Sequence, residues 1–480
     1  MKGLLDNIFG YWVFFYTMLL VLSYVVFCIL AYLMHRRCLA RKYKRGYSFY
    51  SESPYLPGVS VVASAYNEEN VIVECVESFF RLKYPKFEVI IVNDGSKDNT
   101  LEELIKHFSL IEVPYNYHRK VHSKPVKRVF RSTDPQYENL TVVDKINGGT
   151  KADAINAGLN VVKYPYFINT DVDCILAEDA IVQCITPVIG HHNVIAVSGA
   201  MAMNNGCDIE HGELKKRKVP KTPAPLFQAI EYLRSYFIGK MAWSYINAMP
   251  NVSGGYGLFK TDIVIQAGGY SSKSFAEDMD MLIRMIAYCC ESGRDYIVEQ
   301  IPETCCWTQG PPNLRVLHRQ RTRWGRGLIQ TLVNYSRMIF NRNYRRMGLI
   351  TPPYITIFEF LAPIIEALGV VMFIYYALTG AVNWDAAFVI LGSITTFSWA
   401  LAFVTCLYDY INGITYGKAR SYFLLLVAAL LEPALYHPLI VFFSIKGYIT
   451  YLTGKKASWG AMTRKRYRRA HAEQQPAPQI

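Results

Sequence analysis

The sequence predicts an α/β domain with a mainly parallel, Rossmann-like sheet, joined to α-helical transmembrane segments and interfacial amphipathic helices. Two patterns support this fold class. From Gly58 onward, short β-branched runs alternate with stretches of helical periodicity, as in strand–helix units that form a parallel sheet covered on both faces. At each end of the chain, apolar runs are long enough to cross a bilayer.

Residues 12–34 form the first apolar run. At about 1.5 Å per residue, this run can span a hydrocarbon core of about 30 Å. Several Lys and Arg residues follow it up to Arg45, whereas only Lys2 precedes it. Because positive flanks stay on the cytosolic side, we expect the N-terminus outside. Residues 1–45 are thus predicted to be a transmembrane helix with a basic inner flank.

Residues 57–319 are predicted to form a cytosolic domain built from the alternating units. The pattern places strands and helices in turn at residues 59–63, 69–82, 87–92, 98–108, 140–143, 152–161 and 166–168. In such a sheet, ligands bind at the carboxyl ends of the strands. This edge is therefore where functional side chains are expected.

Two stretches inside this domain depart from the alternation of strands and helices. Residues 107–136 contain many basic side chains, and we expect a solvated excursion there. Residues 227–246 place Glu231, Arg234 and Lys240 among aromatic side chains. This second stretch fits either an amphipathic helix at the membrane interface or a buried core helix.

After the domain, apolar runs return. Residues 320–350 mix apolar and basic side chains and are predicted to lie at the membrane interface. Residues 351–455 are predicted to be transmembrane, with spans at 355–378 and 386–407. The last apolar run is interrupted by prolines. A hairpin of two short segments is favoured there over one crossing, because it keeps the basic tail 456–480 in the cytosol.

The composition excludes two broad classes. The formal net charge is +13, but the positive residues cluster beside the apolar runs, which favours an anionic membrane surface over nucleic acid as partner. The eleven cysteines are irregularly spaced, and the sequence has no CxxC pair with a zinc spacing. We therefore expect reduced, buried thiols in a cytosolic domain.

Asp171 and Asp173 follow an apolar strand, one residue apart. Carboxylates in this arrangement can direct oxygen ligands to one hard cation, Mg²⁺ or Mn²⁺, whose remaining ligands are phosphate oxygens and water. The alternative is an acidic pair that caps the next helix. The strand context favours the metal site.

A second group of polar residues surrounds the expected carboxyl edge. Asp94 ends another strand and can accept hydrogen bonds from a nucleotide base or ribose, although it could instead cap the next helix. Tyr66 and Glu68 follow the first strand and would line the same pocket. Lys151 and Asp153 begin a helix whose N-terminus favours phosphate.

Two further clusters lie toward the C-terminal end of the domain. Asp278 follows Glu277 at the start of a helix and is the best candidate for a general base; a helix-capping acid is the alternative. Gln320, Arg323 and Trp324 lie within about one helical turn. The arginine can bind a diphosphate and the indole can stack on a sugar, although a basic membrane anchor has the same pattern.

Taken together, these motifs resemble those of membrane-embedded inverting glycosyltransferases of family two, the group that contains poly-N-acetylglucosamine, hyaluronan and cellulose synthases. The matching stretches are Ala65-Tyr66-Asn67-Glu68-Glu69, Val92-Asn93-Asp94-Gly95-Ser96, Lys151-Ala152-Asp153-Ala154-Ile155-Asn156, Asp171-Val172-Asp173, Ser253-Gly254, Glu277-Asp278 and Gln320-Arg321-Thr322-Arg323-Trp324.

The resemblance implies a GT-A-like cytosolic domain that uses a UDP-sugar. Donor binding would fall to Tyr66, Glu68, Asp94, Lys151, Asp153 and Arg323, and the metal to Asp171 and Asp173. Asp278, beside Glu277, would deprotonate the acceptor hydroxyl, and Gln320, Trp324, Ser253 and Gly254 would bind the acceptor. A single in-line displacement would convert an α-linked donor into a β-linked product.

The expected function is processive synthesis of a β-linked polysaccharide with export through the enzyme's own helices. The alternatives are transfer of one or a few sugars to a lipid acceptor, and a transporter or scaffold whose domain only binds nucleotide. The expected location is the inner (plasma) membrane, in a multi-pass arrangement. The expected partners are the UDP-sugar, a glycan or lipid-linked acceptor, membrane lipids and accessory subunits for export, but no nucleic acid.

Overall fold

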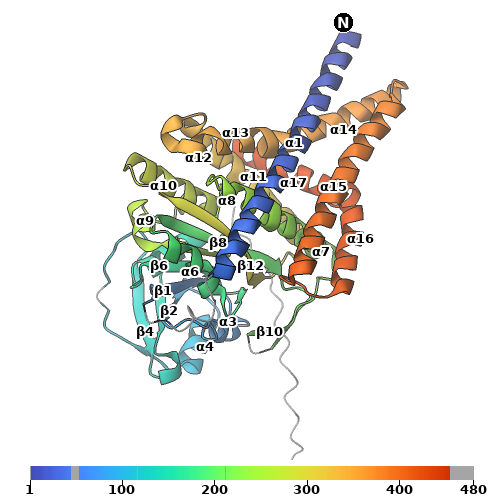
Figure 1. The fold of residues 1–480 in the computed structure, drawn as a ribbon. Coiled ribbons are helices and arrows are strands. Elements are labelled where there is room, and N and C mark those ends of the chain that lie inside the picture. The colour runs from blue at the N-terminus through green and yellow to red at the C-terminus, as the bar shows by residue number, and fades with distance from the viewer. Residues whose placement is uncertain (1, 45–52, 54, 116, 211, 455–480) are drawn as a thin grey trace, which may run out of the picture.

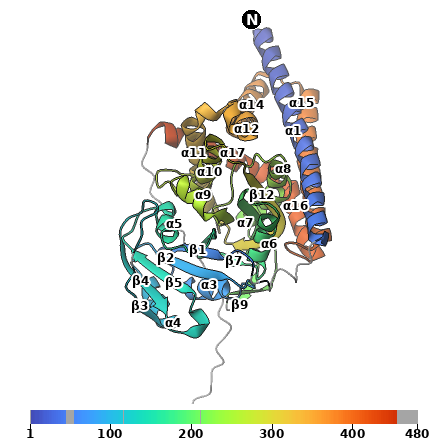
Figure 2. The ribbon, with the colours of Figure 1, turned by 60° about the vertical axis from the view of Figure 1, so that its left-hand side comes forward.

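The computed structural model describes residues 2–44, 53, 55–115, 117–210 and 212–454. Arg45, at the end of the predicted basic flank, and the predicted tail 456–480 lie outside the described residues. Figure 1 and Figure 2 show an α/β domain at one end of the molecule and long apolar helices at the other. These helices are α1 (Lys2–Lys44), α14 (Leu361–Thr379) and α15 (Trp384–Asn412).

The domain is built on one large sheet with the strand order β3-β4-β5-β2-β1-β6-β11-β8-β12-β7. In chain order the strands are β1 (Val59–Ala65), β2 (Phe87–Asn93), β3 (Leu110–Glu112), β4 (Val126–Ser132), β5 (Leu140–Lys145), β6 (Tyr166–Asp171), β7 (Ile175–Leu176), β8 (Val194–Met203), β11 (Tyr256–Lys260) and β12 (Ile297–Thr308). A separate hairpin contains β9 (Asp208–Glu210) and β10 (Glu213–Lys216).

The sheet is mixed, whereas the sequence predicts a mainly parallel one. Strands β5, β2, β1 and β6 are parallel, as expected, but β11 runs antiparallel between β6 and β8. The reason is where β11 starts: Tyr256 pairs with Thr170 near the carboxyl end of β6. The strand must therefore run back along β6, and the loop that precedes it lies at the functional edge of the sheet.

Helices cover both faces of the sheet. Successive side chains of a strand point to opposite faces, and apolar side chains on both faces need to be buried. Val62 and Ile90 belong to one core cluster, and their neighbours Val61 and Ile91 belong to the other. The first face is covered by α5 (Lys151–Leu159), α9 (Thr261–Gln266) and α10 (Glu277–Glu291), and the second by α3 (Ile72–Phe79), α4 (Thr100–His107) and α6 (Ala180–Gly190).

The expected solvated excursion at 107–136 is wrong in part. Strands β3 and β4 lie within it and extend the sheet by antiparallel pairing with each other and with β5. Val129 and Phe130 of β4 are buried, while the basic residues around them are more exposed. The high density of basic side chains concealed these two strands, of which β3 forms the edge of the sheet, because charged residues are common on the solvent side of an edge.

The stretch at 227–246 is a buried helix, which is the second of the two predicted possibilities. It consists of α7 (Pro223–Arg234), the π-helical turn η2 (Ser235–Lys240) and α8 (Met241–Tyr245). Phe227, Leu233 and Trp243 are buried. The segment packs between strand β12 and the apolar helices α1, α15 and α16 (Ala419–Leu435), so it connects the domain to the helical region.

Helix α11 (Leu314–Asn334) carries the predicted arginine–tryptophan cluster and packs along α17 (His437–Leu452). Glycines allow the close contact. A Cβ atom at Gly325 would lie 2.8 Å from the Ser444 carbonyl oxygen, and one at Gly447 would lie 2.5 Å from the Thr322 carbonyl oxygen. The two helix backbones therefore meet without intervening side chains.

Between α11 and α14 lie short elements that turn the chain toward the apolar helices. They are the 3₁₀ turns η3 (Ser336–Met338) and η4 (Arg342–Tyr344), α12 (Arg345–Leu349), α13 (Thr351–Ile355) and the π-helical turn η5 (Thr356–Phe360). A further 3₁₀ turn, η1 (Pro135–Tyr137), precedes β5.

Among the described residues, three helical stretches are long and apolar enough to cross a membrane, at 11–41, 342–379 and 387–412, which marks the chain as a membrane protein. A fourth span would arise if α16 and α17 counted as one. These two helices do not form the expected hairpin, because they are bent by 53°, far less than a reversal of direction. The contact with α11 sets the course of α17 instead.

Candidate active site

The predicted site residues gather at the carboxyl edge of the sheet, facing α10 and α11. Asp171 is the last residue of β6, and Asp94 directly follows β2. The loop 252–255 reaches the same edge because β11 begins beside the end of β6. Helix α10 begins at Glu277, so the predicted base also lies at a chain turn facing this edge.

Asp94 and Asp153 lie on either side of a buried lysine. The Lys145 Nζ atom donates a hydrogen bond to the Asp94 Oδ1 atom at 2.5 Å and lies 2.6 Å from the Asp153 Oδ2 atom. Lys145 itself is fully buried. Burial raises the pKa of the Asp94 carboxyl, and the hydrogen bond from Lys145 opposes this rise. One ammonium group thus serves two carboxylates.

Sequence reasoning missed Lys145. The only signal was a lysine at the end of a β-branched strand, and many surface strands end in that way. Backbone geometry adds to its effect on Asp94. The Gly148 N–H donates to the Asp94 Oδ1 atom at 2.9 Å, and Gly95 has a φ of +63°, a turn that favours glycine. The Asp94 side chain is therefore held in one orientation.

Tyr66 and Glu68 follow β1 in a loop that is tied to the loop after β2. The Glu68 N–H donates to the Thr100 hydroxyl at 2.8 Å, and the Lys97 N–H donates to the Asn67 Oδ1 atom at 2.8 Å. Tyr66 is 44% exposed. Its ring is therefore available to a bound group, while the backbone that carries it is fixed.

Lys151 joins the metal candidate to the loop before β11. Its Nζ atom lies 2.5 Å from the Asp171 Oδ1 atom and donates to the Gly254 carbonyl oxygen at 2.5 Å. Burial lowers the pKa of the Lys151 ammonium, but the Asp171 carboxylate outweighs this effect, so the pKa is raised. The ammonium is therefore a permanent positive charge beside the metal candidate.

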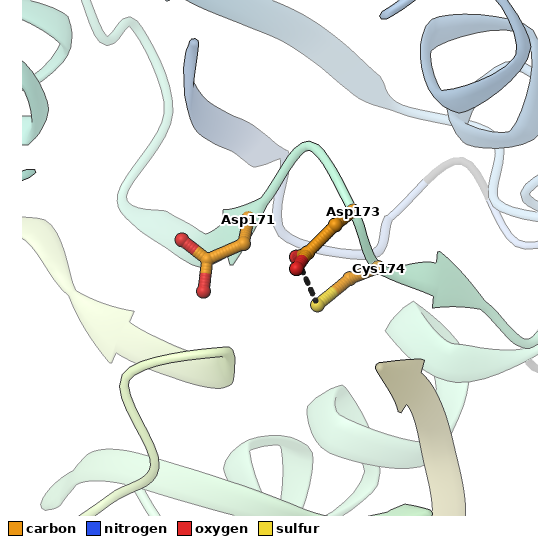
Figure 3. A group of neighbouring side chains, drawn as sticks. All are labelled: Asp171, Asp173 and Cys174. Atoms are coloured by element: carbon orange, nitrogen blue, oxygen red, sulfur yellow. Dashed lines mark hydrogen bonds between the residues drawn. The ribbon is translucent and has the colours of Figure 1, made fainter. Parts of the chain in front are cut away.

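Asp171, Asp173 and Cys174 lie on the turn after β6, and Figure 3 shows the three side chains on the same side of that turn. Their ligand atoms all lie within 4.8 Å of one another. The Cys174 thiol donates to the Asp173 Oδ1 atom at 3.6 Å. Two carboxylates at this spacing fit a hard divalent cation that takes further oxygen ligands from phosphate and water; the thiol is a poor ligand for such an ion.

Asp278 contacts the loop 252–255, which also binds Lys151. Its Oδ2 atom accepts a hydrogen bond from the Gly254 N–H at 3.2 Å, and its Oδ1 atom accepts one from the Met279 N–H at 2.9 Å. Two backbone donors thus orient the carboxylate at the N-terminus of α10. Ser253 lies in the same loop, with its hydroxyl 3.0 Å from the Met201 sulfur.

Glu277 is buried and lies close to Arg323. Burial raises the pKa of the Glu277 carboxyl, and the Arg323 guanidinium, whose Nη1 atom lies 3.8 Å from the Glu277 Oε2 atom, opposes this rise. This contact joins the start of α10 to α11. The base candidate and the predicted diphosphate-binding arginine therefore lie in one cluster.

The remaining residues of the α11 cluster are held by buried partners. The Gln320 Oε1 atom accepts a hydrogen bond from the Gln228 side chain at 3.2 Å. Trp324 is 37% exposed, and the Arg321 guanidinium lies 4.3 Å from the centre of its ring. Arg321 also donates to both Glu231 oxygens, at 2.6 and 2.5 Å. Sequence reasoning missed this role of Arg321, because its partner is 90 residues away.

The structure thus unites most of the predicted site. Contacts run from Lys151 through Asp171 and Gly254 to Asp278, and from Glu277 to Arg323. Asp94 and Asp153 meet through Lys145 rather than directly. Gln320 and Trp324 are anchored by α7 and by Arg321 on α11 itself.

The mixed α/β sheet with its carboxylate-lined edge has the form of a GT-A-like domain. Residues 60–255 match the family described as glycosyl transferase family 2, and residues 226–436 match glycosyl transferase family group 2. The chain therefore contains a glycosyltransferase domain of family 2. The two matches overlap and together include every predicted site residue.

Two curated relatives are poly-β-1,6-N-acetyl-D-glucosamine synthases. The protein from Staphylococcus epidermidis is 27% identical over 277 residues, which is 58% of this chain and 56% of the relative. The protein from Staphylococcus aureus is 26% identical over 321 residues, 66% of this chain and 65% of the relative. The chain thus spans between about half and two thirds of the length of these relatives.

Two solved structures show low similarity to this chain. The mannosyltransferase PcManGT from Pyrobaculum calidifontis, in complex with GDP-Man and Mn²⁺, has 19% identity and a TM-score of 0.48, covering 90% of this chain and 99% of its own. TarS 1–349 from S. aureus, in complex with UDP, has 15% identity and a TM-score of 0.35, covering 83% of this chain and 92% of its own. Similarities at this level support no conclusion about this chain.

Proposed function

We propose that this chain is a membrane-embedded, inverting N-acetylglucosaminyltransferase that extends a β-linked polysaccharide from a UDP-sugar. The single observation that supports this best is the loop 253–254. Its Gly254 carbonyl accepts a hydrogen bond from Lys151, which pairs with the metal candidate Asp171, while the Gly254 N–H donates to Asp278. The donor phosphates beside Asp171 and the acceptor hydroxyl beside Asp278 would therefore lie on either side of Gly254, close enough to react. The sugar is inferred from the names of the curated relatives.

In this proposal the donor lies along the carboxyl edge of the sheet. Asp94, oriented by Lys145 and Gly148, accepts hydrogen bonds from the uracil, and the exposed Tyr66 ring and Glu68 line the pocket. Asp153 holds Lys145 in place. Asp171 and Asp173 hold Mg²⁺ or Mn²⁺, which neutralises charge on the diphosphate. Lys151 adds a fixed positive charge at the same position.

Asp278 acts as the general base. The carboxylate removes the proton from the acceptor hydroxyl as that oxygen bonds to the anomeric carbon, and the bond from this carbon to the diphosphate breaks on the opposite face. UDP leaves, and the α-linked donor becomes a β-linked product. Arg323 stabilises the negative charge of the leaving group, and buried Glu277 keeps the guanidinium in position.

The acceptor lies on the other side of the 253–254 loop. The exposed indole of Trp324 provides a surface for a sugar ring, and Gln320, Ser253 and Gly254 provide hydrogen bonds. Helix α17 packs along α11 on this side, and α14 and α16 contact α17. We infer that the domain faces the cytosol, that the N-terminus is outside, and that the product leaves through the inner membrane along these helices, with accessory subunits where export requires them.

The test uses the purified full chain in lipid nanodiscs with radiolabelled UDP-N-acetylglucosamine and either Mg²⁺ or Mn²⁺. We expect a ladder of long products that loses its label on digestion by a β-N-acetylhexosaminidase. UDP-glucose provides the matched control for sugar choice. One added sugar on extracted lipid would favour the lipid-acceptor alternative instead, and the absence of transfer with either donor would contradict the proposal.

A further inference from the structure

The segment 273–276, which leads into the candidate base, lies along one side of helix α11. It belongs to no helix or strand of the described chain and is followed directly by α10, whose second residue is Asp278. Residues at the helical spacing i, i+3, i+4 and i+7 share one side of a helix. Four residues of α11 at this spacing face the segment and the start of α10, namely Arg323, Arg326, Gly327 and Gln330. Helix α11 therefore provides a continuous surface on which the segment rests.

The Gln330 side chain binds this segment through two backbone groups. Its Oε1 atom accepts a hydrogen bond from the Phe275 N–H at 2.9 Å, and its Nε2 atom donates one to the Lys273 carbonyl oxygen at 3.0 Å. A segment without regular structure must find other partners for its polar backbone groups. Because one amide group satisfies a donor and an acceptor two residues apart, it fixes both the position and the direction of the backbone.

Two neighbouring residues of α11 hold the segment close to the helix. A Cβ atom at Gly327 would lie 2.7 Å from the Ala276 Cβ atom and 3.1 Å from the Ala276 nitrogen, so the helix and the segment are in direct contact. The Arg326 guanidinium lies 3.8 Å from the centre of the Phe275 ring. Arg326 is buried, and within the described part of the chain its Nε and Nη1 atoms have no hydrogen-bond partner. The ring of Phe275 therefore helps to compensate for the burial of this charge.

The same segment is rigidly connected to the candidate base. The Ala276 carbonyl oxygen accepts a hydrogen bond from the Asp280 N–H at 2.9 Å, and this bond closes the first turn of α10. Asp278 lies inside that turn, and its carboxylate accepts the Gly254 N–H at 3.2 Å. Because Ala276 and Asp278 belong to the same closed turn, a shift of the segment moves the base carboxylate with it.

We propose that Gln330 is a positioning residue for the transfer reaction. Its amide holds the segment 273–276 on α11 and so keeps the Asp278 carboxylate where it can take the acceptor proton. This inference rests on the proposed function, in which Asp278 is the base. The groups proposed to hold the donor come from the edge of the sheet, from α5 and from α11 itself, not from this segment. Loss of the Gln330 contacts should therefore reduce kcat and leave donor binding unchanged.

Gln330→Met removes both hydrogen bonds at nearly constant side-chain length. We expect kcat for transfer from UDP-N-acetylglucosamine to fall by about 10- to 100-fold, while the KM for the donor and the affinity for UDP keep their wild-type values. Hydrogen exchange of the backbone N–H groups of residues 273–280, measured by mass spectrometry on the full chain in nanodiscs, should become faster. Gln266→Met, the same change at an exposed glutamine of α9, should alter none of these quantities.

Gly327→Ala disturbs the same contact and leaves the Gln330 amide in place. The added Cβ atom would lie 2.7 Å from the Ala276 Cβ atom, closer than the separation of about 3.5–4.0 Å that carbon atoms prefer, so the segment must move away from α11. We expect the same fall in kcat with UDP affinity kept. Ala276→Gly in the same chain removes one of the two clashing atoms and should restore part of the lost kcat, which a general loss of stability would not do.

The outcomes separate the possible roles. Wild-type kcat or wild-type exchange in Gln330→Met would overturn the inference, and so would a parallel fall in kcat, UDP affinity and melting temperature, which marks a purely structural residue. If Gln330→Met does not fold, Gly327→Ala decides, and wild-type kcat in that variant overturns the inference.

Asp278→Asn tests the proposed function separately. Wild-type transfer in that variant would refute the base assignment itself. Loss of transfer in Asp278→Asn together with wild-type kcat in Gln330→Met would refute only the role of Gln330.

Discussion

At the scale of single residues, the candidate site depends on charges that are neutralised inside the protein. Lys145 is the clearest example, because it is fully buried between Asp94 and Asp153. Lys151 has the equivalent place beside Asp171, and Arg323 beside Glu277. Each cation orients a carboxylate that would otherwise be repelled by its acidic neighbours. The consequence is that the cations, and not only the acids, should control donor binding.

Removal of Lys145 should therefore affect both stability and donor affinity. Lys145→Met leaves two buried carboxylates without their shared cation, and we expect a loss of about 3–5 kcal/mol in the free energy of unfolding, together with weaker UDP binding. Denaturation and calorimetric titration with UDP measure the two effects. Lys163→Met, which removes a half-exposed partner of Glu88, should cost no more than about 1 kcal/mol.

The role of Asp278 should be separable from donor binding. Asp278→Asn keeps the shape and can still accept the Gly254 N–H, but it cannot take a proton. We expect transfer to fall by about 10² to 10⁴-fold while UDP affinity is unchanged. Both quantities are measured on the same nanodisc preparation.

Asp171→Ala provides the contrast. This variant removes a proposed metal ligand, so the gain in UDP affinity on adding Mg²⁺ or Mn²⁺ should shrink. Wild-type turnover in Asp278→Asn, or unaltered metal dependence in Asp171→Ala, would show that the corresponding role has been given to the wrong residue.

At the scale of elements, the proposed acceptor-binding side of the site depends on the position of helix α11. It is fixed to α7 through Arg321 and Glu231, and to the end of α16 through the Tyr436 hydroxyl, which lies 3.0 Å from Arg321 and donates to Glu231 at 3.1 Å. A second pair, Arg234 with Glu432, joins α7 to α16. The indole of Trp324 rests on Arg321, so these ionic contacts also position the surface proposed for the sugar.

This arrangement predicts a pH effect on stability. Burial raises the pKa of Glu231, but the Arg321 guanidinium outweighs it and holds the pKa below its usual value. Glu231 therefore stabilises the fold above the unfolded pKa, and this contribution is lost as pH falls through the lower, folded value. Glu231→Gln should remove this part of the acid sensitivity and cost about 3 kcal/mol at neutral pH, as measured by denaturation midpoints between pH 7 and acid.

Tyr436→Phe gives a milder test of the same contact. It removes one hydroxyl and should cost about 1 kcal/mol without changing the pH dependence. A wild-type acid response in Glu231→Gln would mean that another carboxyl controls the docking of α11.

At the scale of the whole molecule, α1 is joined to both parts of the chain. Phe27 packs edge-on against Trp243 of α8, and the Arg41 guanidinium lies 2.5 Å from Glu299 of β12. Tyr24 meets Phe397 of α15. The same helix therefore holds the domain and the apolar helices in a fixed relation, as Figure 2 illustrates, which suits an enzyme that would pass its product from one to the other.

The orientation proposed for the chain has a direct test. The turn between α14 and α15 contains Ala381, and the turn between α15 and α16 contains Lys418. With the N-terminus outside, a cysteine at position 381 should react with a membrane-impermeant maleimide in intact cells, and one at position 418 only after permeabilisation. The wild-type chain corrects for its own cysteines. The reverse pattern would invert the topology.

Much of the fold could be predicted from local pattern. The strands at 59–63, 87–92 and 140–143 and the helix at 152–161 lie within a few residues of the observed elements, because burial on both faces selects β-branched residues over short runs. The apolar spans could be found because a bilayer imposes a length that is read directly from the chain. The site motifs could be placed because strand ends converge at one edge.

The tertiary structure decided what depends on distant partners. The direction of β11, the pairing of β3 and β4, and the bend between α16 and α17 all follow from neighbours that local sequence does not specify. The same holds for Lys145 and Arg321, whose significance comes from buried charge. In sequence each is one more basic residue among 51. The chain alone determined which groups could do the chemistry, whereas folding decided which of them are paired, because electrostatic energy depends on distance and solvent exclusion rather than on sequence order.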